Sequence, residues 1–242
     1  GGGFIGSITL AFSIIGTGIS TLVAFLVGIS FKETRVKVAR KEKTEYLHVI
    51  KDSLAIIKNN KTILWLVLFF ALFNSLGWTV NWFAQPYLQM LNVPIVYFGL
   101  VFAAFSIVSA IGSSLVDQFE KVTNNKPFLV MTIVTGVVMF LIGRFPSIYI
   151  FPLWSLFGMF MVINQTLTSE KILALIPSER AATVLSFANL VRRFIYAAFG
   201  PILGIISDSF SILTALQTNG IVLLVIMGAL LFARRKVAIQ VR

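Results

Sequence analysis

The sequence has no cysteine, a single histidine and only 12% charged residues among its 242 positions. Without cysteine it cannot be a small secreted domain held together by disulfides. An average soluble domain has about 25% charged residues, so the shortage of charge also excludes an ordinary soluble enzyme and a disordered tail. The single histidine, His48, has no companion for a metal site, and the sequence lacks a phosphate-binding glycine loop, a nucleophile elbow and a zinc-protease helix motif. We therefore expect neither an enzyme nor a cofactor.

Apolar residues make up 57% of the chain and form two long runs without any charge, 28 residues at 4–31 and 55 residues at 62–116. A helix needs about 20 residues to cross a hydrocarbon core of about 30 Å, so the second run must cross twice. These runs, together with shorter ones, predict an all-α integral membrane protein. We expect seven transmembrane helices, at 4–31, 62–85, 94–116, 127–143, 147–169, 179–206 and 211–233.

The net charge of +11 comes from basic residues that gather in the segments between these helices. They lie mainly in 31–61, 117–127, 170–180 and 234–242, and these segments alternate with loops that carry almost no charge. The positive-inside rule then places the basic segments in the cytoplasm and the N-terminus of the sequence outside. We expect a multi-pass protein of the cell membrane, and topology explains the charge without a nucleic-acid partner.

The longest loop contains an apolar stripe with helical spacing beside basic residues. A basic amphipathic helix of this kind suits the anionic inner leaflet of the bilayer, which is the partner that we expect for 32–61. The alternative is that this helix is a target sequence bound by a calmodulin-like protein. The residues on the apolar face are Tyr46, Leu47, Ile50, Leu54 and Ile57.

A polar stripe runs along the expected helix at 62–85. Its members, Asn74, Trp78, Asn81 and Gln85, are spaced by four, three and four residues, which places them on one helical face. Lipid disfavours side-chain amides, so this face must turn toward other helices or a water-filled cavity. Both interpretations stay open, because asparagine and glutamine also serve as hydrogen-bonding contacts between membrane helices.

The expected helix at 147–169 also has polar and small residues near one side. Asn164 and Gln165 are its cavity candidates, accompanied by Ser155, Gly158 and Thr166. The alternative is again close helix packing, which small residues permit.

Arg192 and Arg193 interrupt the expected helix at 179–206 about 21 Å along its length from Ser178. An arginine at mid-membrane costs about 2.5 to 3.5 kcal/mol, so we expect one of the two to face a cavity or a partner. The alternative is that both extend toward the membrane surface from a helix that begins inside the cytoplasm. The spans contain no Asp, Glu, His or Lys between their ends, so this chain alone supplies no proton relay.

Several local motifs carry a resemblance to a known family. The stretch 177–186, Pro-Ser-Glu-Arg-Ala-Ala-Thr-Val-Leu-Ser, looks like the opening of the eleventh helix in many bacterial transporters, and Gly200-Pro201-Ile202-Leu203-Gly204 is similar to that helix's second half. With the basic linker and the alternating loops, the chain resembles the sixth to twelfth helices of a major facilitator superfamily transporter. Asp117 and Lys121 occupy the place of that family's loop motif and are candidates for a gating loop, although Ser113 replaces the motif's glycine and Gln118 its basic residue.

The resemblance implies a domain plan. Residues 1–31 would be the last transmembrane helix of an N-terminal half, 32–61 a cytoplasmic linker, 62–233 a six-helix bundle and 234–242 a cytoplasmic tail. The remainder of the N-terminal half, missing from this sequence, would then be a partner of the bundle.

The resemblance also implies a function. In this family the substrate lies at mid-membrane between two halves that rock about it, and 62–85, 147–169 and 179–206 correspond to helices bordering it. It implies a secondary active transporter that moves a small organic solute by alternating access, of the efflux type, with proton coupling left open. The alternatives are a seven-helix receptor, although 211–233 lacks a Schiff-base lysine, and a membrane scaffold without transport.

Overall fold

The computed structural model describes residues 10–30, 54–124 and 126–238, and within these ranges every regular element is a helix. The all-α prediction is confirmed. Most of the amphipathic surface helix expected in the linker lies outside the described residues. The elements are α2 (Leu10–Ser30), α4 (Lys61–Asn81), α5 (Ala84–Met90), η1 (Ile95–Tyr97), α6 (Phe98–Ser114), α7 (Val116–Val122), α8 (Pro127–Arg144), η2 (Phe151–Trp154), α9 (Ser155–Leu173), α10 (Ser178–Ser209) and α11 (Ile212–Ala238).

Five helical stretches of the described chain are long and apolar enough to cross a membrane: Lys61–Met90, Ile95–Ser114, Pro127–Arg144, Ser178–Ser209 and Ile212–Arg234. The apolar stretch of α2, Gly18–Ile29, is shorter than these five. Helix α9 is not among the five either, and it carries several polar side chains along its 19 residues. The count of seven transmembrane helices therefore stays a prediction.

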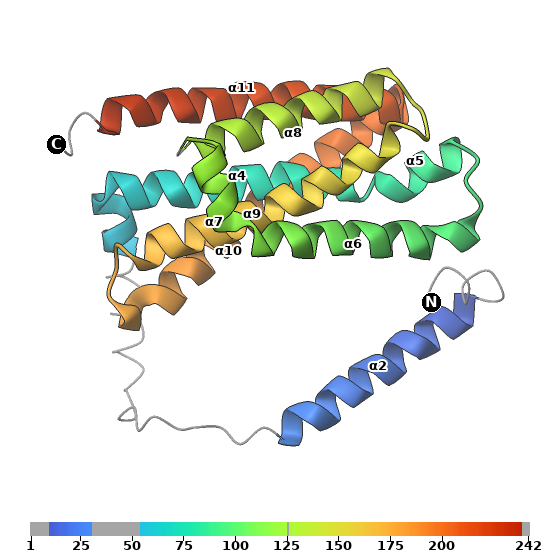
Figure 1. Cartoon of the computed structure of the whole chain (residues 1–242), viewed down its shortest axis with the longest axis horizontal. Helices are drawn as coiled ribbons and strands as arrows, with labels where there is room; N and C mark the ends of the chain where they lie inside the picture. Colours follow the sequence, from blue (N-terminus) through green and yellow to red (C-terminus); the bar gives the residue numbers. More distant parts are fainter. Residues whose placement is uncertain (1–9, 31–53, 125, 239–242) are drawn as a thin grey trace.

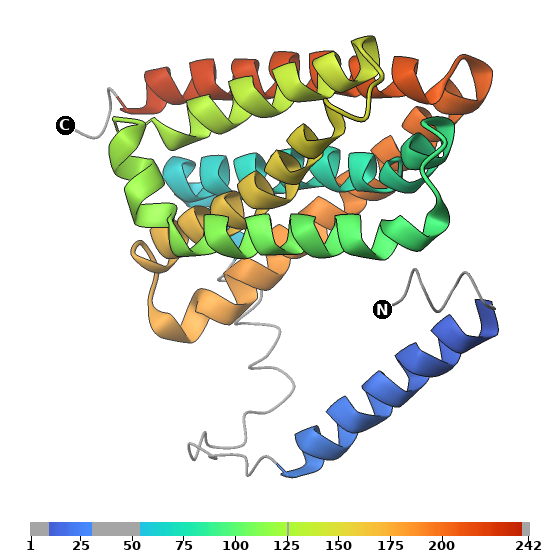
Figure 2. The ribbon, with the colours of Figure 1, turned by 45° about the vertical axis from the view of Figure 1, so that its right-hand side comes forward.

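Six long helices, α4, α6, α8, α9, α10 and α11, lie side by side in a bundle, whereas α2 lies apart from it (Figure 1, Figure 2). Helix α4 occupies the centre and packs against α9, α10 and α11. Its sequence explains this position, because apolar residues surround the helix and most of its side chains are buried. Asn60 starts the helix, since its Oδ1 accepts hydrogen bonds from the backbone N–H groups of Thr62 and Ile63 over 3.0 and 3.2 Å.

Glycines set the close approach of α8 and α11, the pair with the most extensive contact in the bundle. A methyl group added at Gly220 would lie 2.8 Å from the carbonyl oxygen of Gly136 and 3.0 Å from the backbone nitrogen of Phe140. Because both neighbours are backbone atoms, no flexible side chain can move aside, and the methyl group would push the two helices apart. Small residues thus allow the two helices to pack backbone to backbone, as is common in membrane bundles.

The predicted helix at 62–85 is wrong at its C-terminal end, where the chain breaks into α4 and α5. The backbone N–H groups of Trp82 and Phe83 bond to carbonyls three residues earlier, over 3.3 and 2.9 Å, which tightens the last turn of α4. Pro86 explains the break, because in a continuous helix its ring would clash with the carbonyl of Trp82.

Two further predicted helices differ from the observed ones at their ends. The third predicted helix, 94–116, is η1 followed by α6, and the fifth, 147–169, is η2 followed by an α9 that continues to Leu173. Pro94 precedes η1 with extended backbone, and Pro152 lies inside η2. Pro152 would be the sixth residue of the predicted helix at 147–169, where an α-helix needs the N–H group that proline lacks, so the α-helix starts only after it.

Most of the described basic residues outside the pocket gather at one end of the bundle, whereas Arg144, the last residue of α8, lies at the other end. In Figure 1 the start of α4, helix α7, the α9–α10 turn and the last turns of α11 all lie on the left, and they carry Lys61, Lys121, Lys171 and Arg234, among others. The opposite end bears exposed aromatic side chains in its loops, namely Trp82, Tyr97 and Tyr149. Tryptophan and tyrosine are enriched at membrane interfaces. The fold thus separates a basic end from an aromatic end.

Candidate functional site

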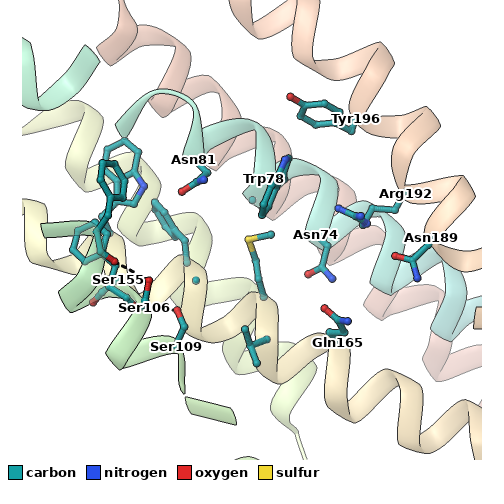
Figure 3. A pocket seen from close by; sticks show the side chains of 18 of the residues that line it. Asn74, Trp78, Asn81, Ser106, Ser109, Ser155, Gln165, Asn189, Arg192 and Tyr196 are labelled. Atoms are coloured by element: carbon teal, nitrogen blue, oxygen red, sulfur yellow. Dashed lines mark hydrogen bonds between the residues drawn. The ribbon is translucent and has the colours of Figure 1, made fainter. Parts of the chain in front are cut away.

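A pocket of about 780 Å³ opens between α4, α6, α9 and α10 (Figure 3). Its wall combines amides, hydroxyls, two arginines and a set of aromatic rings. None of the lining residues is acidic. The lining consists of Asn74, Gly77, Trp78, Asn81, Phe102, Phe105, Ser106, Ser109, Trp154, Ser155, Phe157, Gly158, Met161, Val162, Gln165, Asn189, Arg192, Arg193 and Tyr196.

One end of the pocket is polar. In Figure 3, Asn74 from α4, Gln165 from α9, and Asn189 and Arg192 from α10 lie around the same space. Arg192 is partly buried, whereas Arg193 also lines the pocket but is exposed. Successive helical residues point about 100° apart, which explains why the two arginines differ in burial.

A buried chain of hydrogen bonds orients Asn74. Thr168 Oγ1 donates to Asn164 Oδ1 over 3.1 Å, and Asn164 Nδ2 donates to Asn74 Oδ1 over 3.3 Å. All three residues are at most 3% exposed. Because the Asn74 oxygen is engaged as an acceptor, the amide group left for the pocket is its Nδ2, which can only donate.

The backbone beside Arg192 is anchored to α4. Ser75 Oγ lies 2.6 Å from the carbonyl oxygen of Arg192 and 2.6 Å from that of Ala71. The serine is fully buried, so this polar contact between the two helices is shielded from water. Because Ser75 directly follows Asn74 in α4, this contact fixes where Arg192 lies along the helix axis relative to Asn74.

The other end of the pocket is aromatic and lies between α6 and α9. Ser106, Ser109 and Ser155 lie there together in Figure 3. Each hydroxyl donates to a backbone carbonyl three or four residues earlier, over 2.8, 2.9 and 2.8 Å respectively. Their protons are therefore engaged, and their oxygens retain lone pairs that can accept from a bound molecule.

The structure brings together most of the residues singled out from the sequence. Asn74, Trp78, Asn81, Gln165, Arg192 and Arg193 all line the pocket. Asn164 lies behind Asn74 as its hydrogen-bond partner. Gln85 does not line the pocket, because the break after α4 places it in α5, where it is exposed.

Four polar lining residues were absent from the predicted set, namely Ser106 and Ser109 on α6 and Asn189 and Tyr196 on α10. Asn189 and Tyr196 lie three residues before and four residues after Arg192, so helical spacing places them on its face of α10. That spacing is visible in the sequence. The aromatic residues of α6 carry no such signal, since an apolar residue in a membrane span gives no indication of whether it faces lipid or a pocket.

The loop candidates Asp117 and Lys121 both lie on α7 and are exposed. The ion pair that ties this helix to the bundle uses their neighbour Glu120, whose Oε1 lies 2.7 Å from Lys171 Nζ on α9. A gating role for Asp117 and Lys121 remains a prediction.

The arrangement described so far, a bundle of apolar helices around a polar pocket that opens at mid-length, is typical of solute transporters. Among known protein families, residues 1–201 match the Major Facilitator Superfamily. The chain belongs to this superfamily. No curated protein and no solved structure matches the chain significantly.

As a superfamily member, the chain is a multi-pass membrane protein of a transporter family. The match reaches from the first residue into α10 and so includes α4, α6 and α9, the other three helices that line the pocket. The described residues contain no group of three or more His, Cys, Asp or Glu side chains that could hold a metal ion. Within these residues, charge recognition in the pocket rests on the two arginines.

Proposed function

We propose that this superfamily member transports a small organic solute whose anionic or zwitterionic group binds at Arg192. The observation that carries the proposal is the polarity of the pocket's polar end. Arg192 supplies a permanent positive charge, Asn74 presents its donor group, and no acidic residue lines the wall. A carboxylate about 4 Å from a guanidinium gains about 4 kcal/mol at an effective dielectric constant near 20.

Transport by alternating access requires a second half of the transporter that covers this pocket from the other side. We propose the domain plan of the sequence resemblance: residues 1–31 end an N-terminal half, 32–61 link the halves, 62–233 form the second half and 234–242 form a tail. Support comes from the separation of α2 from the six-helix bundle (Figure 1). In this plan the basic end of the bundle faces the cytoplasm of a cell-membrane protein.

The direction proposed is export. The aromatic end of the pocket suits solutes with an apolar body, and a carboxylic acid of this kind crosses the bilayer in its neutral form and ionises in the cytoplasm. The anion cannot cross back unaided, so a cell needs a transporter to remove it. The pocket wall contains no carboxylate or histidine, so any proton coupling would use groups elsewhere in the full-length protein.

The test replaces Arg192 with glutamine in the full-length protein, and uptake of aromatic carboxylates is measured in proteoliposomes. We expect at least a tenfold loss of carboxylate transport with unchanged membrane insertion, and partial recovery in Arg192→Lys. Arg144→Gln is the matched control, because Arg144 is exposed at the end of α8 and does not line the pocket. Unchanged transport in Arg192→Gln, Arg193→Gln and the double variant would contradict the proposal.

A second role for Arg192 is an ion pair with a carboxylate of the N-terminal half. The partial burial of Arg192 within a span favours a charged partner of some kind. The two roles separate by substrate, because a lost ion pair between the halves would reduce the transport of neutral and anionic solutes alike. A loss confined to anionic solutes assigns Arg192 to the substrate.

A further inference from the structure

The aromatic end of the pocket contains a polar group without a partner. Trp154 is 2% exposed, and its indole Nε1 has no hydrogen-bond acceptor in the structure. A buried donor without an acceptor costs about 1 to 3 kcal/mol. Trp154 also lines the pocket. Nε1 is itself buried, so an acceptor bound in the pocket removes this cost when a small side-chain shift opens the nitrogen to it.

The side chains that pack against Trp154 offer its N–H group no acceptor. Three aromatic rings surround the indole, with ring centroids 5.4 Å away for Tyr87, 5.3 Å for Phe151 and 5.7 Å for Phe157. The two phenylalanines have no acceptor atom on their side chains. Tyr87 Oη donates to the carbonyl oxygen of Ile142 over 3.1 Å, away from the indole. The rings fix the plane of Trp154 without satisfying its N–H group.

This donor and the arginine lie at opposite ends of the pocket. Figure 3 shows Asn81 and Ser155, the neighbour of Trp154 in sequence, on one side, and Asn74 and Arg192 on the other. Asn74 and Asn81 are seven residues apart on α4, which corresponds to about 10 Å along the helix. Trp78 lines the pocket between the two ends (Figure 3).

We propose that the pocket recognises its substrate at two points, so that the substrate class is an elongated amphipathic organic anion. Its anionic group binds at Arg192 and Asn74, its flat apolar body lies against Trp78, and an uncharged acceptor at the far end, such as a carbonyl oxygen, accepts from Trp154 Nε1. This inference rests on the proposed function, since it assumes that Arg192 holds the anion. It adds the length of the solute and the kind of group at its far end.

The test measures the binding of two matched probes to the full-length protein in nanodiscs. The probes are 4′-acetylbiphenyl-4-carboxylate and 4′-isopropylbiphenyl-4-carboxylate, which share the carboxylate, the length and the apolar body but differ in the carbonyl acceptor. We expect the acetyl probe to bind the wild type more tightly. Trp154→Phe, which keeps an aromatic ring and removes the N–H group, should weaken the acetyl probe about tenfold and leave the isopropyl probe unchanged. Trp82→Phe is the control, because Trp82 is 65% exposed and does not line the pocket.

The outcomes separate this inference from the function on which it rests. Equal changes for both probes in Trp154→Phe, or none for either, would overturn the two-point recognition. If Arg192→Gln still weakens both probes in that case, the anion site at Arg192 is supported and the contact at Trp154 is not. Failure of both probes to bind the wild type would also overturn two-point recognition of this substrate class, while the transport measurement with Arg192→Gln would decide the anion site separately.

Discussion

At the scale of single residues, the polar end of the pocket depends on side chains that never reach it. Asn164 and Thr168 are buried behind Asn74, and their hydrogen bonds decide which end of the Asn74 amide is engaged. In a site without acidic groups, this orientation adds a donor beside the arginine. Selectivity for anions would therefore rest on the residues behind the wall as well as on the charge.

Replacing Asn164 with leucine tests this dependence. The change leaves Asn74 Oδ1 and Thr168 Oγ1 without their partners in a buried site, so we expect a loss of about 1 to 3 kcal/mol in stability and weaker carboxylate binding. Thermal unfolding and binding of the biphenyl carboxylates measure the two effects. Adding Thr168→Val relieves one unpaired group and should recover part of the stability but not the binding. Carboxylate binding at the wild-type level in Asn164→Leu would show that Asn74 needs no orientation.

At the scale of the helices, two kinds of contact hold the bundle. Helices α8 and α11 meet at glycines, while α4 and α11 meet at an aromatic and cationic cluster near the basic end. There Trp65 Nε1 donates to the carbonyl oxygen of Leu230 over 2.9 Å, and the Arg234 guanidinium lies 4.6 Å from the Trp65 ring centroid. Phe128 of α8 meets the same indole edge to face. Both contacts hold α8 and α11 in the bundle outside the pocket.

The glycine contact gives a prediction for Gly220→Ala. The added methyl group would meet the backbones at Gly136 and Phe140, so we expect α8 and α11 to separate slightly and the melting temperature in detergent to fall by several degrees. Gly228→Ala is the matched control on the same helix, because nothing lies within 4 Å of its added methyl group. It should leave stability unchanged or slightly raise it, since alanine favours helix more than glycine does. Equal melting temperatures for the two variants would argue against backbone contact.

At the scale of the whole molecule, the bundle has a basic end and an aromatic end, which predicts its orientation in the membrane. Val122 lies at the basic end and is 81% exposed, and Tyr149 lies at the aromatic end and is 91% exposed. These 242 residues contain no cysteine, so an introduced cysteine is the only thiol among them. An impermeant thiol reagent applied to intact cells should label Tyr149→Cys and not Val122→Cys. Labelling with the opposite preference would reverse the topology.

The sequence by itself determined the membrane class, the positions of most helices and the polarity of the loops. These features depend on local quantities, namely the length of uncharged runs, the positions of prolines and the distribution of lysine and arginine. Helical spacing also placed Asn74, Trp78 and Asn81 on one face, because periodicity within a single helix is local. Arg192 stood out in the same way, as a charge within an apolar span.

Only the tertiary structure decided which of these faces meet. The break between α4 and α5 excluded Gln85 from the pocket, and the contact between α4 and α9 placed Asn164 behind Asn74. The unpartnered indole of Trp154 is likewise visible only in three dimensions, since its state depends on which rings surround it. Pairing between helices depends on side chains distant in sequence, and in an apolar span a lipid-facing residue and a pocket-facing residue can be of the same type.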